Sequence, residues 1–222
     1  MRLFLPPMIV AVVAAMALAA PMPEETRERE RLEKAGARVK VDDRLPTEAR
    51  LVATFDKLDD KAAANLNGLK HVGKFTVDDA SGLTDKTLAV IGTFTNLREL
   101  SLTKSGMTNV GMNSLKGLKQ LRKLYLIDAK VYDSGVAVLK NLDRLEEVDL
   151  SGSGITNAAG ATFKELPDLT LLAVNKTKFG DTGAAYLKEL KSLKKLEAIN
   201  TDVSVKAAMA LEEAIKGVRV RR

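Results

Sequence analysis

The chain has 222 residues, of which 45% are hydrophobic, 29% charged and only 4% aromatic, and it contains neither cysteine nor tryptophan. This composition is typical of a globular protein whose core is built from aliphatic residues. The absence of cysteine excludes disulfides, thiol catalysis and every cysteine-based metal site. The formal net charge of +6 is too mild an excess to predict nucleic-acid binding.

Residues 1–20 have the organisation of a secretory signal peptide. Arg2 precedes an unbroken apolar run over residues 8–20, and residues 17–19 form a small-x-small cleavage site. We therefore expect an exported protein located in the periplasm, in the cell envelope or outside the cell. The alternative is an uncleaved leader that anchors the chain, because the apolar run counted from Leu3 is only slightly shorter than a membrane-spanning helix.

Residues 21–38 predict a charged linker that contains a helix over residues 24–35. Two pairs of opposite charge have the favourable i,i+4 order on this helix: Glu25/Arg29 and Glu30/Lys34. Leu32 is its one apolar contact residue, so we expect a solvated or loosely docked spacer. The alternative is a stalk that binds a partner.

Residues 39–71 are expected to form an N-terminal cap. Val39 and Val41 alternate with charged residues, which is typical of an edge strand over residues 38–42, and a degenerate strand is expected near Val52. The apolar residues between 58 and 69 have helical spacing. Repeat proteins need such atypical end units, whose outer faces are polar.

Residues 72–222 are predicted to contain a series of repeats that ends in a C-terminal cap. Five leucines follow one another at intervals of 24 residues: Leu97, Leu121, Leu145, Leu169 and Leu193. Each repeat begins with the alternation of a strand and continues with the spacing of a helix. The cap is expected to include a last short strand over residues 218–221.

Two further columns of the repeat concern the start of each helix. One holds polar residues that are good helix N-caps: Asn109, Asp133, Asn157 and Asp181. The other lies two residues later and holds small residues, which predict close packing: Gly111, Gly135, Ala159 and Gly183.

Three stretches carry a resemblance to a known family: LRELSLTKSGMTNVG, LEEVDLSGSGITNAA and LTLLAVNKTKFGDTG. They match the pattern Leu-x-x-Leu-x-Leu-x-x-(Thr/Ser)-x-(Ile/Val), and the chain resembles a leucine-rich-repeat protein over residues 58–222. The 24-residue repeats are similar to the cysteine-containing class, as found in exported bacterial proteins. The resemblance implies an α/β solenoid with a parallel sheet on its concave face and short helices on its convex face.

The resemblance also implies a non-catalytic module that binds a protein partner through the concave face. Strand alternation directs the residues between the leucines to that face. An aromatic residue with aliphatic and charged neighbours is typical of a binding hot spot. The candidate partner-binding residues are Glu99, Lys123, Tyr125, Ile127, Glu147, Asp149, Leu171 and Asn175. The alternative is an ordinary solvated sheet on which Tyr125, Ile127 and Leu171 are exposed singly.

A second surface supports another function. Lysines recur every 24 residues near the expected helix C-termini: Lys116, Lys140, Lys164 and Lys188. This column would suit a structural envelope component that binds an anionic envelope polymer, or it is simply favourable pairing of lysine with helix ends.

We expect no enzyme, metal, cofactor or small-molecule substrate. His71 is the single histidine, and the chain has no phosphate-binding loop or nucleophile elbow.

Overall fold

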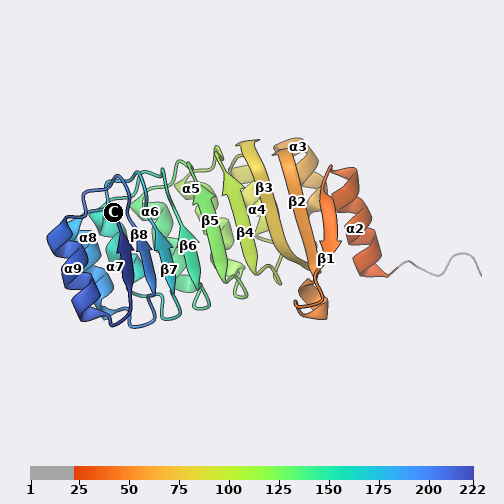
Figure 1. Ribbon diagram of the computed structural model, residues 1–222. Coiled ribbons are helices and arrows are strands. Elements are labelled where there is room, and N and C mark those ends of the chain that lie inside the picture. Colours follow the sequence, from red (N-terminus) through yellow and green to blue (C-terminus); the bar gives the residue numbers. More distant parts are fainter. Residues whose placement is uncertain (1–22) are drawn as a thin grey trace, which may run out of the picture.

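The computed structural model describes residues 23–222, so the predicted signal peptide lies outside the described residues. Over residues 23–222, nine strands form one sheet whose order follows the chain from β1 to β9. Short helices alternate with the strands and lie against one face of the sheet, which gives an α/β fold of two layers (Figure 1). The sheet is not closed, because β1 and β9 are its two edges.

The strands are longest near the N-terminal end, where β3 has 11 residues, and shortest at the other end, where β9 has 3. The strands are β1 (Arg38–Val41), β2 (Leu51–Asp59), β3 (Val72–Gly82), β4 (Glu99–Thr103), β5 (Lys123–Ile127), β6 (Glu147–Asp149), β7 (Leu171–Ala173), β8 (Lys195–Glu197) and β9 (Arg219–Arg221). The α-helices are α2 (Glu24–Lys34), α3 (Asp60–Ala63), α4 (Asp85–Ile91), α5 (Asn109–Met112), α6 (Asp133–Val136), α7 (Gly160–Phe163), α8 (Asp181–Tyr186) and α9 (Val205–Ala214). The 3₁₀ helices are η1 (Thr47–Ala49), η2 (Ala64–Leu66), η3 (Asn113–Gly117), η4 (Ala137–Asn141), η5 (Asn157–Ala159) and η6 (Leu187–Glu189).

The register of the strands follows the sequence repeat. β1 pairs with β2 in the antiparallel direction, and the later neighbours are parallel. Leu100 lies opposite Leu124, Val148 lies between Leu124 and Leu172, and Leu172 lies opposite Leu196. Residues 24 positions apart therefore stand side by side on adjoining strands, as the spacing predicts.

The predicted strands at the two ends of the sheet are confirmed. The edge strand expected over residues 38–42 is β1, and the last strand expected over residues 218–221 is β9. The degenerate strand expected near Val52 is the nine-residue strand β2.

One apolar core extends between the sheet and the helices from Leu32 to Val218. The inward side chains of the strands and the apolar residues of the helices are buried there. Three rings fill the N-terminal part, where the centroid of Phe75 lies 5.3 Å from that of Phe55 and 5.6 Å from that of Phe94. Each buried large side chain stabilises the fold by about 1.5–3 kcal/mol.

The predicted role of the Asn/Asp column as N-caps is wrong. The N-cap of α5 is Thr108 and that of η5 is Thr156, one residue before the column, and each hydroxyl accepts an N–H of its own helix. The column side chain reaches the following repeat instead. Asp133 accepts hydrogen bonds from the backbone N–H of Thr156 at 2.9 Å and from its hydroxyl at 2.7 Å. Asp85 binds Thr108 in the same way. Asx side chains therefore tie each repeat to the next.

The close packing predicted at the small-residue column is confirmed, and the neighbour is this same Asx column. A Cβ on Gly111 would lie 2.3 Å from Oδ1 of Asp85, and a Cβ on Gly135 would lie 2.5 Å from Oδ1 of Asn109. Real Cβ atoms essentially never approach so closely. Glycine therefore leaves the space that the carboxylate or amide of the preceding repeat occupies.

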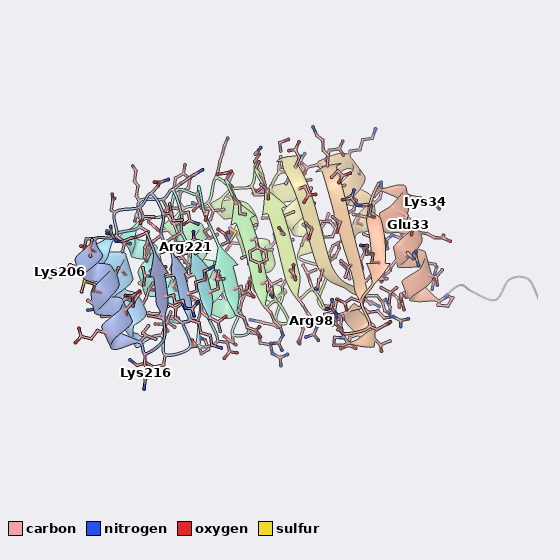
Figure 2. The ribbon with its side chains drawn as sticks, viewed as in Figure 1. Glu33, Lys34, Arg98, Lys206, Lys216 and Arg221 are labelled. Atoms are coloured by element: carbon pink, nitrogen blue, oxygen red, sulfur yellow. The ribbon has the colours of Figure 1, made fainter. Side chains whose placement is uncertain are left out.

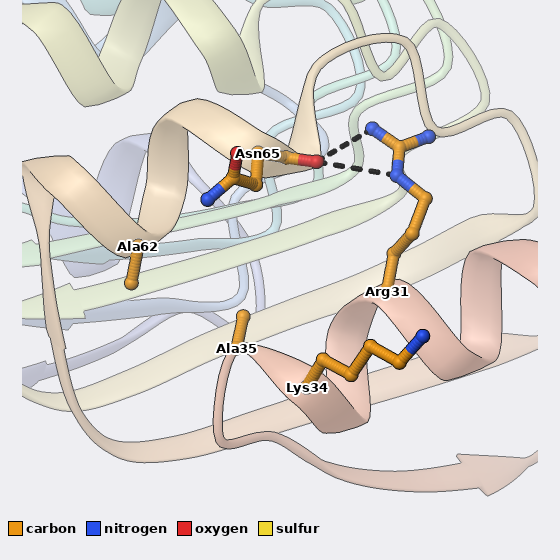
Figure 3. Close-up of a pocket in the computed structure, with 5 residues that line it drawn as sticks. All are labelled: Arg31, Lys34, Ala35, Ala62 and Asn65. Atoms are coloured by element: carbon orange, nitrogen blue, oxygen red, sulfur yellow. Dashed lines mark hydrogen bonds between the residues drawn. The ribbon is translucent and has the colours of Figure 1, made fainter.

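Helix α2 is docked more firmly than its sequence predicts. Glu28 is buried and accepts hydrogen bonds from the backbone N–H groups of Lys70 and His71, both at 2.8 Å. Arg31 donates to the carbonyl oxygen of Asn65, across a pocket of about 280 Å³ with alanines on its walls (Figure 3). The backbone acceptors and donors of the sheet side, which no sequence pattern marks, provide this attachment.

The ion pairs expected along α2 are also wrong within residues 23–222. Glu25 forms an ion pair with Arg50 at 2.8 Å, and Arg29 pairs with Glu33 at 2.8 Å. No salt bridge joins Glu30 to Lys34 in the part of the chain that the structure describes. Because Arg50 lies next to β2, Glu25 faces the protein rather than its helical neighbour.

Replacing Asp133 with alanine should lower the free energy of unfolding by about 2 kcal/mol, because two hydrogen bonds to Thr156 are lost and a partly buried N–H is left unpaired. Urea denaturation measures this change. Asp168→Ala is the matched control, since Asp168 is exposed and makes no hydrogen bond within the described residues. Equal unfolding midpoints for the two variants would contradict the inter-repeat role.

Left-handed backbone recurs at the residue that leaves each regular strand. Lys104, Asp128, Gly152, Lys176 and Asn200 have φ values of 61°, 55°, 73°, 55° and 58°. Only one member of this column is glycine, although left-handed backbone costs other residues roughly 1–2 kcal/mol.

The Lys176→Gly variant should therefore be more stable than the wild type by about 0.5–1 kcal/mol, because relief of strain exceeds the entropy that glycine adds to the unfolded chain. Gly152→Ala should be less stable, because its Cβ would lie 2.0 Å from Oδ1 of Asp128. Thermal unfolding of both variants checks these signs, and a destabilised Lys176→Gly would refute the strain argument.

Candidate functional site

The helices cover one face of the sheet, and we call the other the open face (Figure 1). Side chains of this face form rows across the strands because paired residues stand side by side. The first row contains Lys74, Glu99, Lys123, Glu147, Leu171, Lys195 and Arg219. The second contains Thr76, Ser101, Tyr125, Asp149, Ala173, Glu197 and Arg221. The predicted residues of the first two rows are thus brought together on one surface.

Glu147 is the centre of a hydrogen-bonded group on the open face. Lys123 donates to its Oε1 at 2.6 Å, and the hydroxyl of Tyr125 donates to its Oε2. Burial would raise the pKa of Glu147, but the bonds from Lys123 and Tyr125 outweigh it and the pKa is lowered. The same bond to Glu147 raises the pKa of Lys123. Glu147 is therefore held as a carboxylate, and Lys123 as an ammonium group.

Tyr125 lies in the middle of the sheet, beside Ser101 on β4 and Asp149 on β6. Its ring is half-buried between the neighbouring side chains. Burial, followed by the hydrogen bond to Glu147, raises its pKa above the ordinary value of about 10. The phenol is consequently a fixed donor whose ring remains partly available to a partner.

The three apolar residues expected to be exposed are instead half-buried. Tyr125, Ile127 and Leu171 all have intermediate exposure. Strands stand only about 4.8 Å apart, so the long side chains of the neighbouring strands cover part of each residue. The apolar area on offer is therefore smaller than the sequence alone indicates.

The remaining predicted residues are committed to contacts within the chain. The carboxylate of Asp149 accepts from the N–H of Ser151, and Asn175 donates to the hydroxyl of Ser151 and accepts from the N–H of Ile199. Glu99 lies 3.7 Å from the ammonium group of Lys74. These side chains set the shape and charge of the open face, with fewer free hydrogen-bonding groups than expected.

Sequence reasoning missed a pocket of about 450 Å³ at the start of strands β3 to β5. One wall is the segment of Leu45 and Pro46, which follows β1. Arg98 and Arg122 line the opposite side, and Arg98 lies at the lower edge of the sheet in Figure 2. Both arginines immediately precede a strand and are 24 residues apart, which is the signal in the repeat that could have drawn attention to them.

Other kinds of site have no support within residues 23–222. No group of three or more metal-ligating side chains occurs there. No helix among these residues has the length and apolar character needed to span a bilayer. His71 lies with its Nδ1 3.4 Å from the buried carboxylate of Glu28.

Comparison with protein-family models gives no match, and comparison with curated proteins gives none. The functional argument accordingly depends on the geometry and charge of this chain.

The late ionisation of Tyr125 can be measured directly, because the chain has three tyrosines and no tryptophan. An alkaline titration of phenolate absorbance should contain a component above pH 10 that Tyr125→Phe removes and Glu147→Gln moves to lower pH. The exposed carboxylate of Glu165 provides the control variant Glu165→Gln. Because the fold favours the protonated phenol, its stabilising contribution is present below pH 10 and is lost as the pH rises through the folded pKa. A titration unchanged by Glu147→Gln would disprove the coupling.

Proposed function

We propose that this chain is an exported leucine-rich-repeat solenoid that acts as a non-catalytic module and binds a protein partner on the open, concave face. The 24-residue period, the parallel strands in register and the helices on a single face support the solenoid. The apolar run and cleavage site within residues 1–20 support export.

The single observation that carries the binding role is the ordered group of Tyr125, Lys123 and Glu147 at the middle of the open face. Its members are held by one another and by adjoining strands, so little side-chain entropy remains to be lost on binding. A half-buried tyrosine beside a fixed ion pair is the kind of anchor found at binding hot spots.

Tyr125→Ala and Glu147→Ala should each weaken capture of a stoichiometric partner from periplasmic or secreted extract by about tenfold or more. Tyr186→Ala is the control, because this partly exposed tyrosine belongs to α8 on the opposite layer. Circular dichroism checks that each variant keeps its fold. Partner capture that survives both open-face substitutions would refute the proposal.

The second candidate is a structural envelope component that binds an anionic envelope polymer through the lysine column. Lys116, Lys140 and Lys188 are exposed and form no salt bridge among residues 23–222, which favours this candidate. Lys164 lies 5.8 Å from the centre of the Tyr186 ring. Salt-sensitive retention by envelope material that is lost in a Lys116→Gln/Lys140→Gln variant, and is unaffected by Tyr125→Ala, would support it.

A further inference from the structure

The missed pocket at the start of β3 to β5 is strongly basic. Five of the eight residues that line it are lysine or arginine, and Glu99 is the one acidic member. Its volume of about 450 Å³ is within the usual range for a binding pocket. Leu45 and Pro46 supply an apolar wall against which the carbon chain of a ligand can pack.

Most of these cations already have a carboxylate partner. Arg44 binds Asp42 through two nitrogens, at 2.9 and 3.0 Å, and Lys123 binds Glu147. Lys74 lies 3.7 Å from Glu99, and Arg122 forms an ion pair with Glu146. These pairs compensate the charges of four of the five cations.

Arg98 is the exception. Its side chain is only 18% exposed, and its nearest carboxylate, that of Glu48, is 4.0 Å away on an exposed side chain. Its Nε is buried and has no hydrogen-bond acceptor within residues 23–222. Buried donors in proteins are normally paired, and a guanidinium group offers a planar fork that matches a carboxylate. The pocket therefore contains one strong donor group whose partner is not part of the described chain.

We propose that this pocket binds the side-chain carboxylate of an aspartate or glutamate residue carried by the protein partner. This inference rests on the proposed function, because the pocket shares Glu99 and Lys123 with the open face and is continuous with it. One uncompensated cation suits a group of single negative charge better than a phosphate dianion. The apolar wall suits the methylene groups of an acidic side chain.

The test uses a synthetic hexaglutamate peptide as the probe, with hexaglutamine as the uncharged peptide and inorganic phosphate as the free anion. Arg98→Gln should weaken hexaglutamate binding by about tenfold or more, because the paired charge is removed. Arg98→Lys keeps the charge but loses the fork, and should weaken binding by a smaller factor. Glu48→Gln should strengthen it, since a competing carboxylate is removed.

Lys194→Gln is the matched control. Lys194 occupies the same column of the repeat as Arg98 and Arg122, is exposed, and lies outside the pocket. It should bind the peptide as the wild type does. Equal losses in Arg98→Gln and Lys194→Gln would overturn the proposal, as would Arg98-dependent binding of phosphate without binding of hexaglutamate.

The peptide measurement separates this proposal from the proposed function. A partner that is still captured through Tyr125, together with a peptide that fails to bind, overturns the pocket alone. Peptide binding that requires Arg98 supports the pocket even in a preparation from which no partner is captured.

Discussion

A single 24-residue unit of this chain cannot bury its own apolar side chains, so each unit is stable only against its neighbours. A strand and a short helix have apolar faces toward one another and open flanks on both sides. The structure closes those flanks with parallel pairing, for instance Leu100 with Leu124, and with the Asx hydrogen bonds from Asp85 and Asp133 to the following unit. The same pairing fixes the spacing of side chains on the open face. Stability and the geometry of the binding surface therefore have one cause.

The two ends of the sheet are protected in different ways. At the N-terminal end, α2 is attached through the buried carboxylate of Glu28, and β1 adds an antiparallel edge. At the other end, the carboxylate of Glu212 on α9 accepts from the outward N–H of Val220 in β9. Arg219 and Arg221 place charges along this edge. A sheet with exposed, unpaired edges would risk association with other chains, and these features oppose it.

Much of the fold could be predicted because the strand and helix periods are written directly in the repeat. The Asx column was misassigned because asparagine and aspartate suit an N-cap and a bond to the next unit equally well. Only the position of Thr156 relative to Asp133 distinguishes the two roles. The attachment of α2 depends on backbone groups at Lys70 and Asn65, which have no side-chain signature.

The candidate site was predicted less completely than the fold. Alternation placed Tyr125 and Glu147 on the correct face, since a strand has only two faces. It could not reveal how far neighbouring side chains cover Tyr125, because that depends on the rotamers of adjoining strands. The pocket at Arg98 also needs the segment of Leu45, which is 53 residues away in the chain (from 45 to 98) and is brought there by the β1–β2 connection.

The register across the parallel strands is the most direct test of this account, and the cysteine-free chain provides a clean background for cross-linking. Thr76 and Ser101 are paired on β3 and β4, whereas Thr103 lies two residues further along β4. Paired strands are about 4.8 Å apart, within the Cα separation that a disulfide spans, and a two-residue offset exceeds it. Oxidation should cross-link a Thr76→Cys/Ser101→Cys variant rapidly and a Thr76→Cys/Thr103→Cys variant poorly. Faster cross-linking of the offset pair would contradict the stacked register on which the open face depends.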